Sequence, residues 1–349
     1  MKKVAIIGAG ISGLFIANLF KNSSNYQIKI FEKNNLINLD GGYGVQLSVN
    51  SVKLLNNIEF YKFKDDKKFN PNKIIFYSNK SPNKLCDLNI SDFNSNDCKY
   101  TTLKRSDLVG FLKDKVEDLI KYNHSISKID KNNKKIRLTF ENNETFECDY
   151  LIISDGVFSK SKNLISNNKT QAKYNNTLAI RGMISNSNNI IDNKNISLFF
   201  GSDFHHVIYP MTPNGDLNFI AIMKFKLSDE ELKNYSLFSD NSFIQKILDN
   251  VPQECKKIFN EIKQLKMFPV FVSDNFFKIK INNIYLIGDA FFALPPSFAQ
   301  GASQSIEGAY ELFKKIENNT EENFFRVRVK KTKMVNIRSK INQFIFHLS

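Results

Sequence analysis

Residues 284–309 combine residue types that suit the binding of a polar cofactor. The segment reads IYLIGDAFFALPPSFAQGASQSIEGA, in which an apolar run ends at Gly288-Asp289 and a proline pair precedes Gln300-Gly301-Ala302. This order predicts a buried strand, a carboxylate at its carboxyl end, a stiff turn and then a helix N-terminus. The first N–H groups of a helix lack partners within the helix, and its dipole is positive there. Such an end therefore suits an anion or a polar cofactor.

A second constellation lies in the first 32 residues. Residues 4–7 read as a buried strand, Gly8-Ala9-Gly10-Ile11-Ser12-Gly13 as a turn into a helix, and residues 27–31 as a strand ending at Glu32. In this context the first glycine permits a tight turn, the second lets the backbone approach a pyrophosphate, and the third lets helix and strand pack closely. The acid can accept hydrogen bonds from an adenosine ribose. The unit predicts dinucleotide binding and fits NAD and FAD equally.

The middle of the chain predicts a different kind of structure. Residues 41–47, GGYGVQL, read as a glycine-rich loop that enters a short apolar segment. Between about 177 and 225, the segments TLAIRGMI, ISLFFG, HHVIYPM and LNFIAIMKF alternate with Asn- and Gly-rich turns. They predict an antiparallel sheet inserted between the nucleotide-binding segments. Residues 252–266 read as a helix.

Composition narrows the function classes. The chain has 349 residues and a net charge of +14, but its lysines are scattered and no run pairs stacking aromatics with a basic groove. Nucleic-acid binding is therefore not expected. The four cysteines show no CxxC or Cys-His spacing, which predicts free thiols and no metal site. No apolar run spans a bilayer and the N-terminus is unlike a signal peptide, so a cytoplasmic location is expected.

Together, these motifs resemble those of flavin-dependent aromatic hydroxylases of the para-hydroxybenzoate hydroxylase type, nearest to the salicylate-hydroxylase-like branch. The resemblance covers nearly the whole chain in order. It rests on five segments: GAGISG with Glu32, GGYGVQLSVNSVKLL, KRSDL, ISDGVFSKSK and IGDAFFALPPSFAQGASQSIE. It implies a mixed α/β (α+β) fold, with a Rossmann-like FAD-binding domain and an inserted antiparallel-sheet substrate domain. The implied FAD-binding domain is discontinuous (1–72, 99–170 and 271–315), the substrate domain takes 73–98 and 171–270, and 316–349 form a C-terminal helix.

The resemblance assigns the cofactor contacts residue by residue. The glycine turn with Glu32 would hold the ADP half of FAD, Arg105 and Asp155 would support the pyrophosphate, and Asp289 would bind the ribityl hydroxyls. The helix end at residues 300–302 would face the flavin pyrimidine, whose reduction places negative charge there. The predicted FAD-binding set is Gly8, Gly10, Ser12, Gly13, Glu32, Arg105, Asp155, Gly288, Asp289, Pro296, Gln300, Gly301 and Ala302.

The chain departs from the family pattern at three places. Phe292 stands near the position where the family has a histidine. Glu307-Gly308-Ala309 replaces the usual Glu-Asp-Ala. The arginine that often follows the Asp-Gly motif is absent, with Lys160 and Lys162 nearby.

For the substrate side, GSDFHHVIYP resembles the branch's G-x-x-x-H-x-V-x-Y-P pattern. His205 and Tyr209 share one strand face and are predicted to orient or deprotonate a phenol, whereas His206 is expected to be solvated. Arg181 on the same sheet is a candidate partner for a substrate carboxylate. The implied reaction uses NADH or NADPH as a transient donor, and O₂ through a flavin C4a-hydroperoxide, to hydroxylate a small aromatic or hydroxy-heteroaromatic molecule.

Alternatives remain at this point. One is a membrane-associated hydroxylase of a polyprenyl phenol, of the ubiquinone-biosynthesis type, because basic and apolar residues interleave after residue 325. A helix packed on the FAD-binding domain is favoured over that membrane contact. Another is a non-catalytic FAD-binding redox module. Flavin halogenation is disfavoured because its Trp-x-Trp motif cannot occur in a chain without tryptophan. A monomer or homodimer is expected, and the sequence does not identify the substrate.

Overall fold

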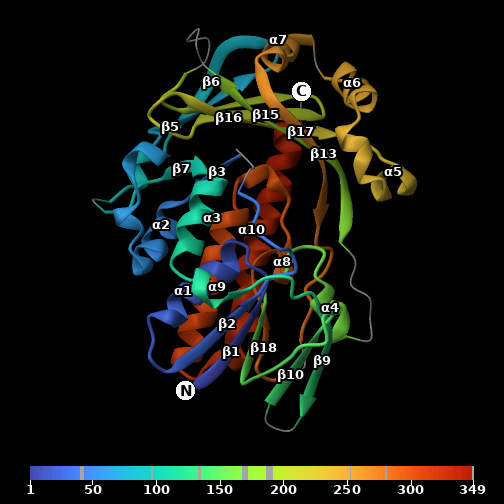
Figure 1. The fold of residues 1–349 in the computed structure, drawn as a ribbon. Coiled ribbons are helices and arrows are strands. Elements are labelled where there is room, and N and C mark those ends of the chain that lie inside the picture. The colour runs from blue at the N-terminus through green and yellow to red at the C-terminus, as the bar shows by residue number, and fades with distance from the viewer. Residues whose placement is uncertain are drawn as a thin grey trace.

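The protein is described here by a computed structural model covering residues 1–39, 43–95, 97–132, 135–166, 172–185, 192–251, 253–279 and 281–347. Figure 1 shows a nucleotide-binding half at the bottom, a broad sheet at the top, and the long helix α10 (Phe324–Phe346) running between them. Gly41 and Gly42 of the predicted glycine-rich loop lie outside the described residues.

A five-stranded parallel sheet forms the centre of the lower half. Its order is β18-β12-β1-β2-β8, and the strands are Ile284–Leu286, Tyr150–Ile153, Lys2–Ile7, Tyr26–Phe31 and Ile120–Lys121. Side chains alternate along β1: Val4 and Ile6 pack with the helices α1 (Ile11–Lys21), α3 (Arg105–Asp114) and α9 (Gly301–Glu317). Ala5 and Ile7 face the other core cluster. Both faces are buried, as a parallel sheet requires.

The second face of this sheet is covered by a three-stranded meander and short helices. The strands are β9 (Ile126–Asn132), β10 (Lys135–Phe140) and β11 (Thr145–Cys148), in the antiparallel order β11-β10-β9. The helices are α4 (Lys160–Leu164) and α8 (Gly288–Phe292), the second of which starts directly after β18. This connection places Asp289 at the carboxyl edge of the sheet.

The upper half is built on a seven-stranded sheet of order β17-β13-β16-β15-β14-β5-β6, in which only the β14–β5 pair is parallel. Its strands are Ile262–Val272, Lys173–Ser185, Asp216–Lys224, Phe204–Pro210, Ile196–Gly201, Lys73–Ser78 and Ser81–Asn89. The helices α5 (Asp229–Lys233), α6 (Asn241–Asp249) and α7 (Lys256–Asn260) follow β16 in the chain.

The helix predicted for residues 252–266 is wrong in its second half. Helix α7 ends at Asn260, and β17 starts at Ile262. Pairing with β13 from residue 262 onward satisfies the backbone of this segment, so tertiary context overrides the local pattern.

A small sheet and a helix connect the two halves. The sheet consists of β3 (Gly44–Leu47), β7 (Thr101–Lys104) and β4 (Lys68–Phe69). The helix is α2 (Val49–Leu55), which follows β3. The Gly44 N–H donates to Asn218 Oδ1 of β16 at 2.6 Å, and Thr102 Oγ1 donates to the Pro210 carbonyl at 2.5 Å. These bonds fix the upper sheet over the carboxyl edge of the lower one.

Candidate active site

The glycine turn after β1 is shaped by close contact with the end of β12. Gly8 has φ +98°, and a Cβ there would lie 2.6 Å from the Ser154 carbonyl oxygen. A Cβ on Gly13 would lie 2.1 Å from the Gly8 carbonyl oxygen. Only glycine fits at either position, so helix α1 can start directly above the strand.

The open side of the same turn has the form of an anion cradle. A Cβ on Gly10 would meet no atom within 4 Å, and the N-terminus of α1 has no side-chain cap. Glu32 is buried; it accepts from Ala9 N at 3.0 Å and from Asn34 Nδ2 at 2.8 Å. The Gly8 N–H donates to the Phe31 carbonyl and the Ala9 N–H to Glu32, so these bonds brace the turn from behind. The open space beside Gly10, at the uncapped N-terminus of α1, fits a pyrophosphate.

Asp155 lies at the carboxyl end of β12, beside this cradle. Its Oδ2 accepts from Ser161 N at 3.1 Å, while its Oδ1 is buried without a hydrogen-bond partner in the described part of the chain. A buried carboxylate oxygen without a donor costs free energy unless a bound group supplies one.

Asp289 faces two cations from other elements. Burial raises the pKa of its carboxyl group, and the neighbouring charges of Arg105 and Lys162 oppose that rise. Arg105, the first residue of α3, is exposed, yet desolvation and then the charge of Arg181 lower its pKa. The space beside the glycine turn, Arg105, Asp155, Lys162 and Asp289 is here called the cofactor recess. It therefore holds both positive and negative side chains, as a polar cofactor with phosphate groups requires.

Lys162 is a site residue that the sequence analysis did not select. It lies on α4, is buried at 7% exposure, and forms no ion pair within 4.0 Å in the described part of the chain. Burial lowers its pKa, and Asp155 and Asp289 partly offset the effect. The sequence signal was its place seven residues after Asp155, where a cation replaces the arginine expected in that region.

The N-terminus of α9 closes the site on the other side. Pro296 opens a short turn, Ala299 has φ +50°, and Gln300 precedes the helix without capping it through its side chain. A Cβ on Gly301 would meet nothing within 4 Å, so the first turn of α9 faces open space. Ser303 Oγ accepts from Ser48 N at 3.3 Å and links this turn to the residue that follows β3.

The upper sheet places Arg181 of β13 above this recess. Its guanidinium carbon lies 5.6 Å from the centre of the Tyr43 ring, within cation–π distance. Arg181 forms no ion pair or side-chain hydrogen bond with another described residue, and burial lowers its pKa. Its charge contributes, after desolvation, to the lowered pKa of Arg105 in the lower half, so the two guanidinium groups lie near each other.

Tyr209 lies on the same sheet face, buried at 3% exposure against β3. A Cβ on Gly44 would approach its hydroxyl oxygen to 2.6 Å, so the glycine makes room for the phenol. Burial raises the pKa of Tyr209 far above neutrality. The phenol is therefore a neutral hydrogen-bonding group rather than a base.

The two histidines of β15 are both buried, with exposures of 2% and 1%. His205 Nδ1 lies 2.8 Å from Nε2 of His347 after the end of α10, so it is engaged with the C-terminal helix. The expectation that His206 is solvated is wrong. It stacks on Phe199 with ring centres 4.4 Å apart, and burial lowers its pKa to about 3.

Comparison with known proteins identifies the cofactor. A family model described as an FAD binding domain matches residues 120–323. The chain belongs to this family. Its cofactor is FAD, as predicted. The N-termini of α1 and α9, which lack a side-chain cap, and the Asp155 oxygen without a partner among the described residues fit that cofactor.

This FAD-binding protein is similar to aromatic monooxygenases along most of its length. A salicylate hydroxylase of Pseudomonas putida is 20% identical over 345 residues, covering 89% of this chain and 76% of the relative. A 3-amino-4-hydroxybenzoate 2-monooxygenase of Streptomyces platensis is 19% identical over 315 residues, covering 89% and 78%. The predicted resemblance to FAD-dependent aromatic hydroxylases is confirmed.

Solved structures confirm the fold class of this FAD-binding protein. Klebsiella pneumoniae HpxO, complexed with FAD and uric acid, superposes with a TM-score of 0.85 at 16% identity, covering 100% of this chain and 89% of that one. A substrate complex of salicylate hydroxylase gives 0.80 at 18% identity, covering 99% and 89%.

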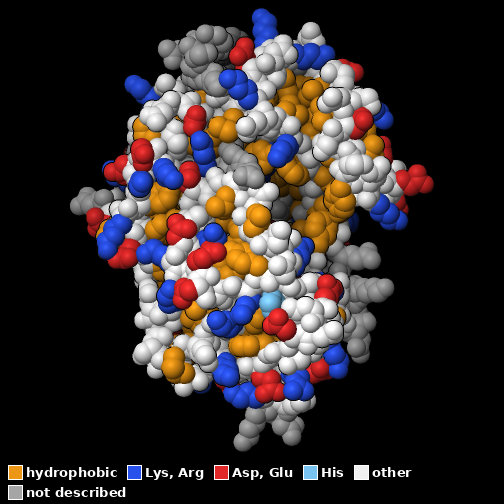
Figure 2. Space-filling view, viewed as in Figure 1, with side chains coloured by type: hydrophobic (Ala, Val, Ile, Leu, Met, Phe, Trp, Pro, Cys, Tyr) orange, Lys and Arg blue, Asp and Glu red, His pale blue; other side chains and the backbone are white. Residues whose placement is uncertain are grey.

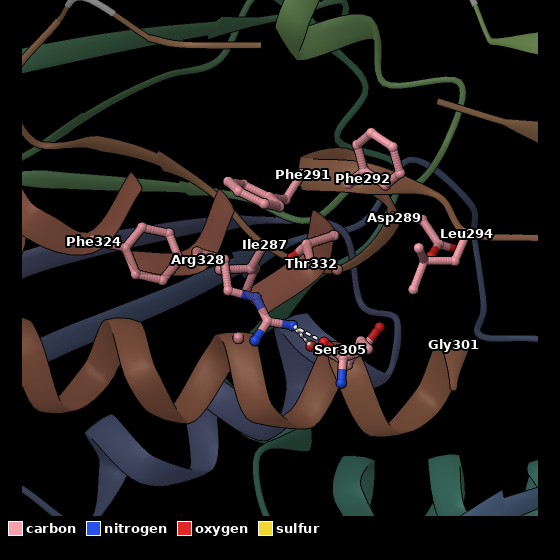
Figure 3. A pocket seen from close by; sticks show the side chains of 13 residues that line it. Ile287, Asp289, Phe291, Phe292, Leu294, Gly301, Ser305, Phe324, Arg328 and Thr332 are labelled. Carbon is pink, nitrogen blue, oxygen red and sulfur yellow. Dashed lines mark hydrogen bonds between the residues drawn. The ribbon is translucent and has the colours of Figure 1, made fainter. Parts of the chain in front are cut away.

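The structure accounts for two departures from the family pattern. Phe292 is in the core, where it stacks on Phe276 with ring centres 4.3 Å apart. Gly308 makes room for Arg328 of α10, whose Nε would lie 3.1 Å from a Cβ there. Arg328 Nη2 donates to the carbonyl and side-chain oxygens of Gln304 at 2.7 and 2.8 Å. Figure 3 shows these bonds, with Asp289 on the side of the same pocket nearer Gly301.

Proposed function

We propose that this protein is an FAD-dependent monooxygenase that hydroxylates an anionic aromatic or hydroxy-heteroaromatic molecule, with NADH or NADPH and O₂ as co-substrates. The observation that carries the substrate class is Arg181, a cation without an acid partner among the described residues, on the face of the sheet above the cofactor residues. The named substrates of the similar enzymes, salicylate and aminohydroxybenzoate, are acids, as is the uric acid bound to HpxO.

The cofactor residues have separable roles in this proposal. Gly10 and the N-terminus of α1 would bind the pyrophosphate, Glu32 the ribose, and Asp289 the ribityl hydroxyls. The N-terminus of α9 at Gly301 would stabilise negative charge on the flavin pyrimidine. FAD, once reduced by the nicotinamide donor, supplies the activation of O₂.

The substrate would lie between Arg181 and the cofactor. Arg181 would bind its negative charge, and an adjacent guanidinium lowers the pKa of a bound hydroxyl group, which favours the electron-rich anion. The ring of Tyr43 restricts the position of that guanidinium. This arrangement needs no histidine base, in agreement with the engagement of His205 by His347. Tyr209 would fix β3 beneath the substrate through packing.

The surface offers an entry to this space. Figure 2 shows a hollow between the upper sheet and the lower half, with hydrophobic side chains gathered around it. A partly apolar entrance suits an aromatic ring, and water exclusion protects the reactive oxygen species formed inside. No group of three or more metal-ligating side chains occurs within the residues the structure describes.

The test is a screen of aromatic acids and hydroxy-heteroaromatics for stimulated NAD(P)H oxidation, with detection of the hydroxylated product. The purified protein should be yellow, and Asp289→Ala should weaken its retention of FAD. Arg181→Gln should raise the KM for an anionic substrate by about 100-fold with FAD content unchanged.

The matched control for Arg181→Gln is Lys173→Gln, which removes a cation from the same strand at an exposed position paired with Asp274. Equal KM values in wild type and Arg181→Gln would refute the role of Arg181. A yellow protein that consumes no NAD(P)H with any compound would favour the non-catalytic redox module instead.

A further inference from the structure

In helix α10 a row of apolar side chains faces solvent and several polar side chains face the protein, the reverse of an ordinary surface helix. Its five exposed apolar side chains are Met334, Ile337, Ile341, Phe344 and Ile345, with exposures of 52%, 58%, 50%, 66% and 47%. Their spacings of three, four, three and one residues place them on one stripe of the helix, here called the α10 stripe. No other described helix has a comparable exposed series.

The side of α10 that faces the protein is partly polar. Arg328, Thr332 and Ser339 are buried there, with Phe324 and Phe346 at the two ends. Thr332 Oγ1 and Ser339 Oγ have no hydrogen-bond partner within the ranges that the structure describes. A helix that only packed on the FAD-binding domain would bury its isoleucines and expose these hydroxyls. The described residues therefore leave the stripe 47–66% exposed, where an apolar environment would cover it.

Cations flank the α10 stripe on both sides. The helix contains seven Lys or Arg residues and no Asp or Glu. At 100° per residue, Lys333 and Lys340 fall on one side of the stripe and Lys331 and Arg338 on the other, and all four are exposed. Lys331 pairs with Glu311 at 3.2 Å, whereas the other three form no ion pair within 4.0 Å among the described residues.

We propose that the α10 stripe binds the surface of an anionic phospholipid bilayer. An apolar stripe about 100° wide between two rows of cations suits a helix lying in the membrane plane, with its apolar side chains below the headgroups and its cations at the phosphates. No helix in the described ranges is long and apolar enough to cross a bilayer, so the contact is peripheral.

A second copy of the chain fits the stripe less well. Two-fold pairing through the α10 stripe would bring together two sets of the four flanking cations, with no acid on either helix to neutralise them. Anionic headgroups supply the missing negative charge. The proposal depends only on α10 and not on the reaction that the enzyme catalyses.

The experiment is flotation of the FAD-loaded, full-length protein with two kinds of vesicle, one of phosphatidylcholine alone and one that also contains phosphatidylglycerol. We expect binding to the anionic vesicles and little to the neutral ones. Lys333→Gln with Arg338→Gln should weaken binding about 25-fold, because each interfacial cation contributes about fivefold. Ile337→Gln with Ile341→Gln should abolish detectable flotation.

The control is Leu85→Gln with Phe93→Gln, which replaces two apolar residues of similar exposure, 58% and 66%, on the upper sheet and its following loop. It should float like wild type, and all variants should retain FAD and their melting temperature. Absence of flotation with either vesicle, or equal binding to both, would overturn the proposal. So would a lipid-free dimer that Ile337→Gln with Ile341→Gln dissociates, because a second copy would then cover the stripe.

Discussion

The cofactor recess and the face of the upper sheet differ in what holds their polar groups. In the recess, Gly8, Gly13 and Glu32 are fixed by contacts with the backbone, such as the 3.0 Å bond from Ala9 N to Glu32. On the sheet, His205 depends on His347, which lies 142 residues away in the sequence. Substitutions in the recess should therefore act through backbone geometry, and those on the sheet through packing and protonation.

The largest expected effect is a difference in apoprotein stability between substitutions at two glycines of the same turn, Gly13 and Gly10. Gly13→Ala places a Cβ 2.1 Å from the Gly8 carbonyl oxygen, so it should lower the free energy of unfolding of the apoprotein by about 3 kcal/mol or more. Gly10→Ala meets no atom within 4 Å and should leave apoprotein stability within about 0.5 kcal/mol while weakening FAD binding at least about tenfold. Denaturant unfolding of the apoprotein and FAD titration measure the two quantities.

This pair tests whether the open side of the turn is the cofactor side. The prediction would be wrong if Gly10→Ala bound FAD as tightly as wild type. It would also be wrong if both variants destabilised the apoprotein equally, because the turn would then be uniformly packed.

The next effect concerns protonation within the upper sheet. The unfolded chain takes up protons below about pH 6.5, but folded His206 resists protonation because burial lowers its pKa to about 3. The free energy of unfolding should therefore fall as the pH drops from about 6.5 toward 3, by about 2 kcal/mol at pH 5 for this histidine. Burial also lowers the pKa of His205 and of His347, which adds to the same trend.

Urea unfolding of His206→Leu near neutral pH and near pH 5 isolates one histidine. The variant should lose about 2 kcal/mol less than wild type over that interval, whatever its stability at neutral pH. Identical losses of unfolding free energy in the two proteins would show that folded His206 is protonated at pH 5 as readily as it is in the unfolded chain.

His206 also illustrates why the sequence predicts the two regions unequally. The glycine turn, Glu32 and the strand before Asp289 are neighbours along the chain, so a local pattern defines their geometry. The strand alternation correctly places His205 and Tyr209 on one face, but it does not reveal that α6 and α7 cover the face of His206 or that α10 reaches His205. Burial of a sheet face depends on elements far away in sequence.

A smaller effect is expected at Lys162, whose ammonium group forms no ion pair within 4.0 Å among the described residues. Lys162→Met should stabilise the apoprotein slightly, because burial disfavours the charged form, yet weaken FAD binding about tenfold by removing a cation from the recess. The matched variant Lys160→Met removes an exposed lysine that pairs with Glu141 on the outer side of α4. It should leave FAD affinity unchanged, and equal effects of the two variants on FAD titration would argue against a cofactor contact at Lys162.

The smallest effect tests the contact between α9 and α10, which connects the recess with the upper sheet. Gly308→Ala gains about 1 kcal/mol of helix propensity but pushes against Arg328, whose Nε would lie 3.1 Å from the new Cβ. In the wild-type background we expect the gain in helix propensity and the cost of the clash nearly to cancel. In an Arg328→Met background the clash is relieved, so the same substitution should stabilise the protein by about 1 kcal/mol. A double-mutant cycle of unfolding free energies measures this coupling. Additive effects would mean that α10 adjusts freely, and the departure at Gly308 would then have no structural link to Arg328.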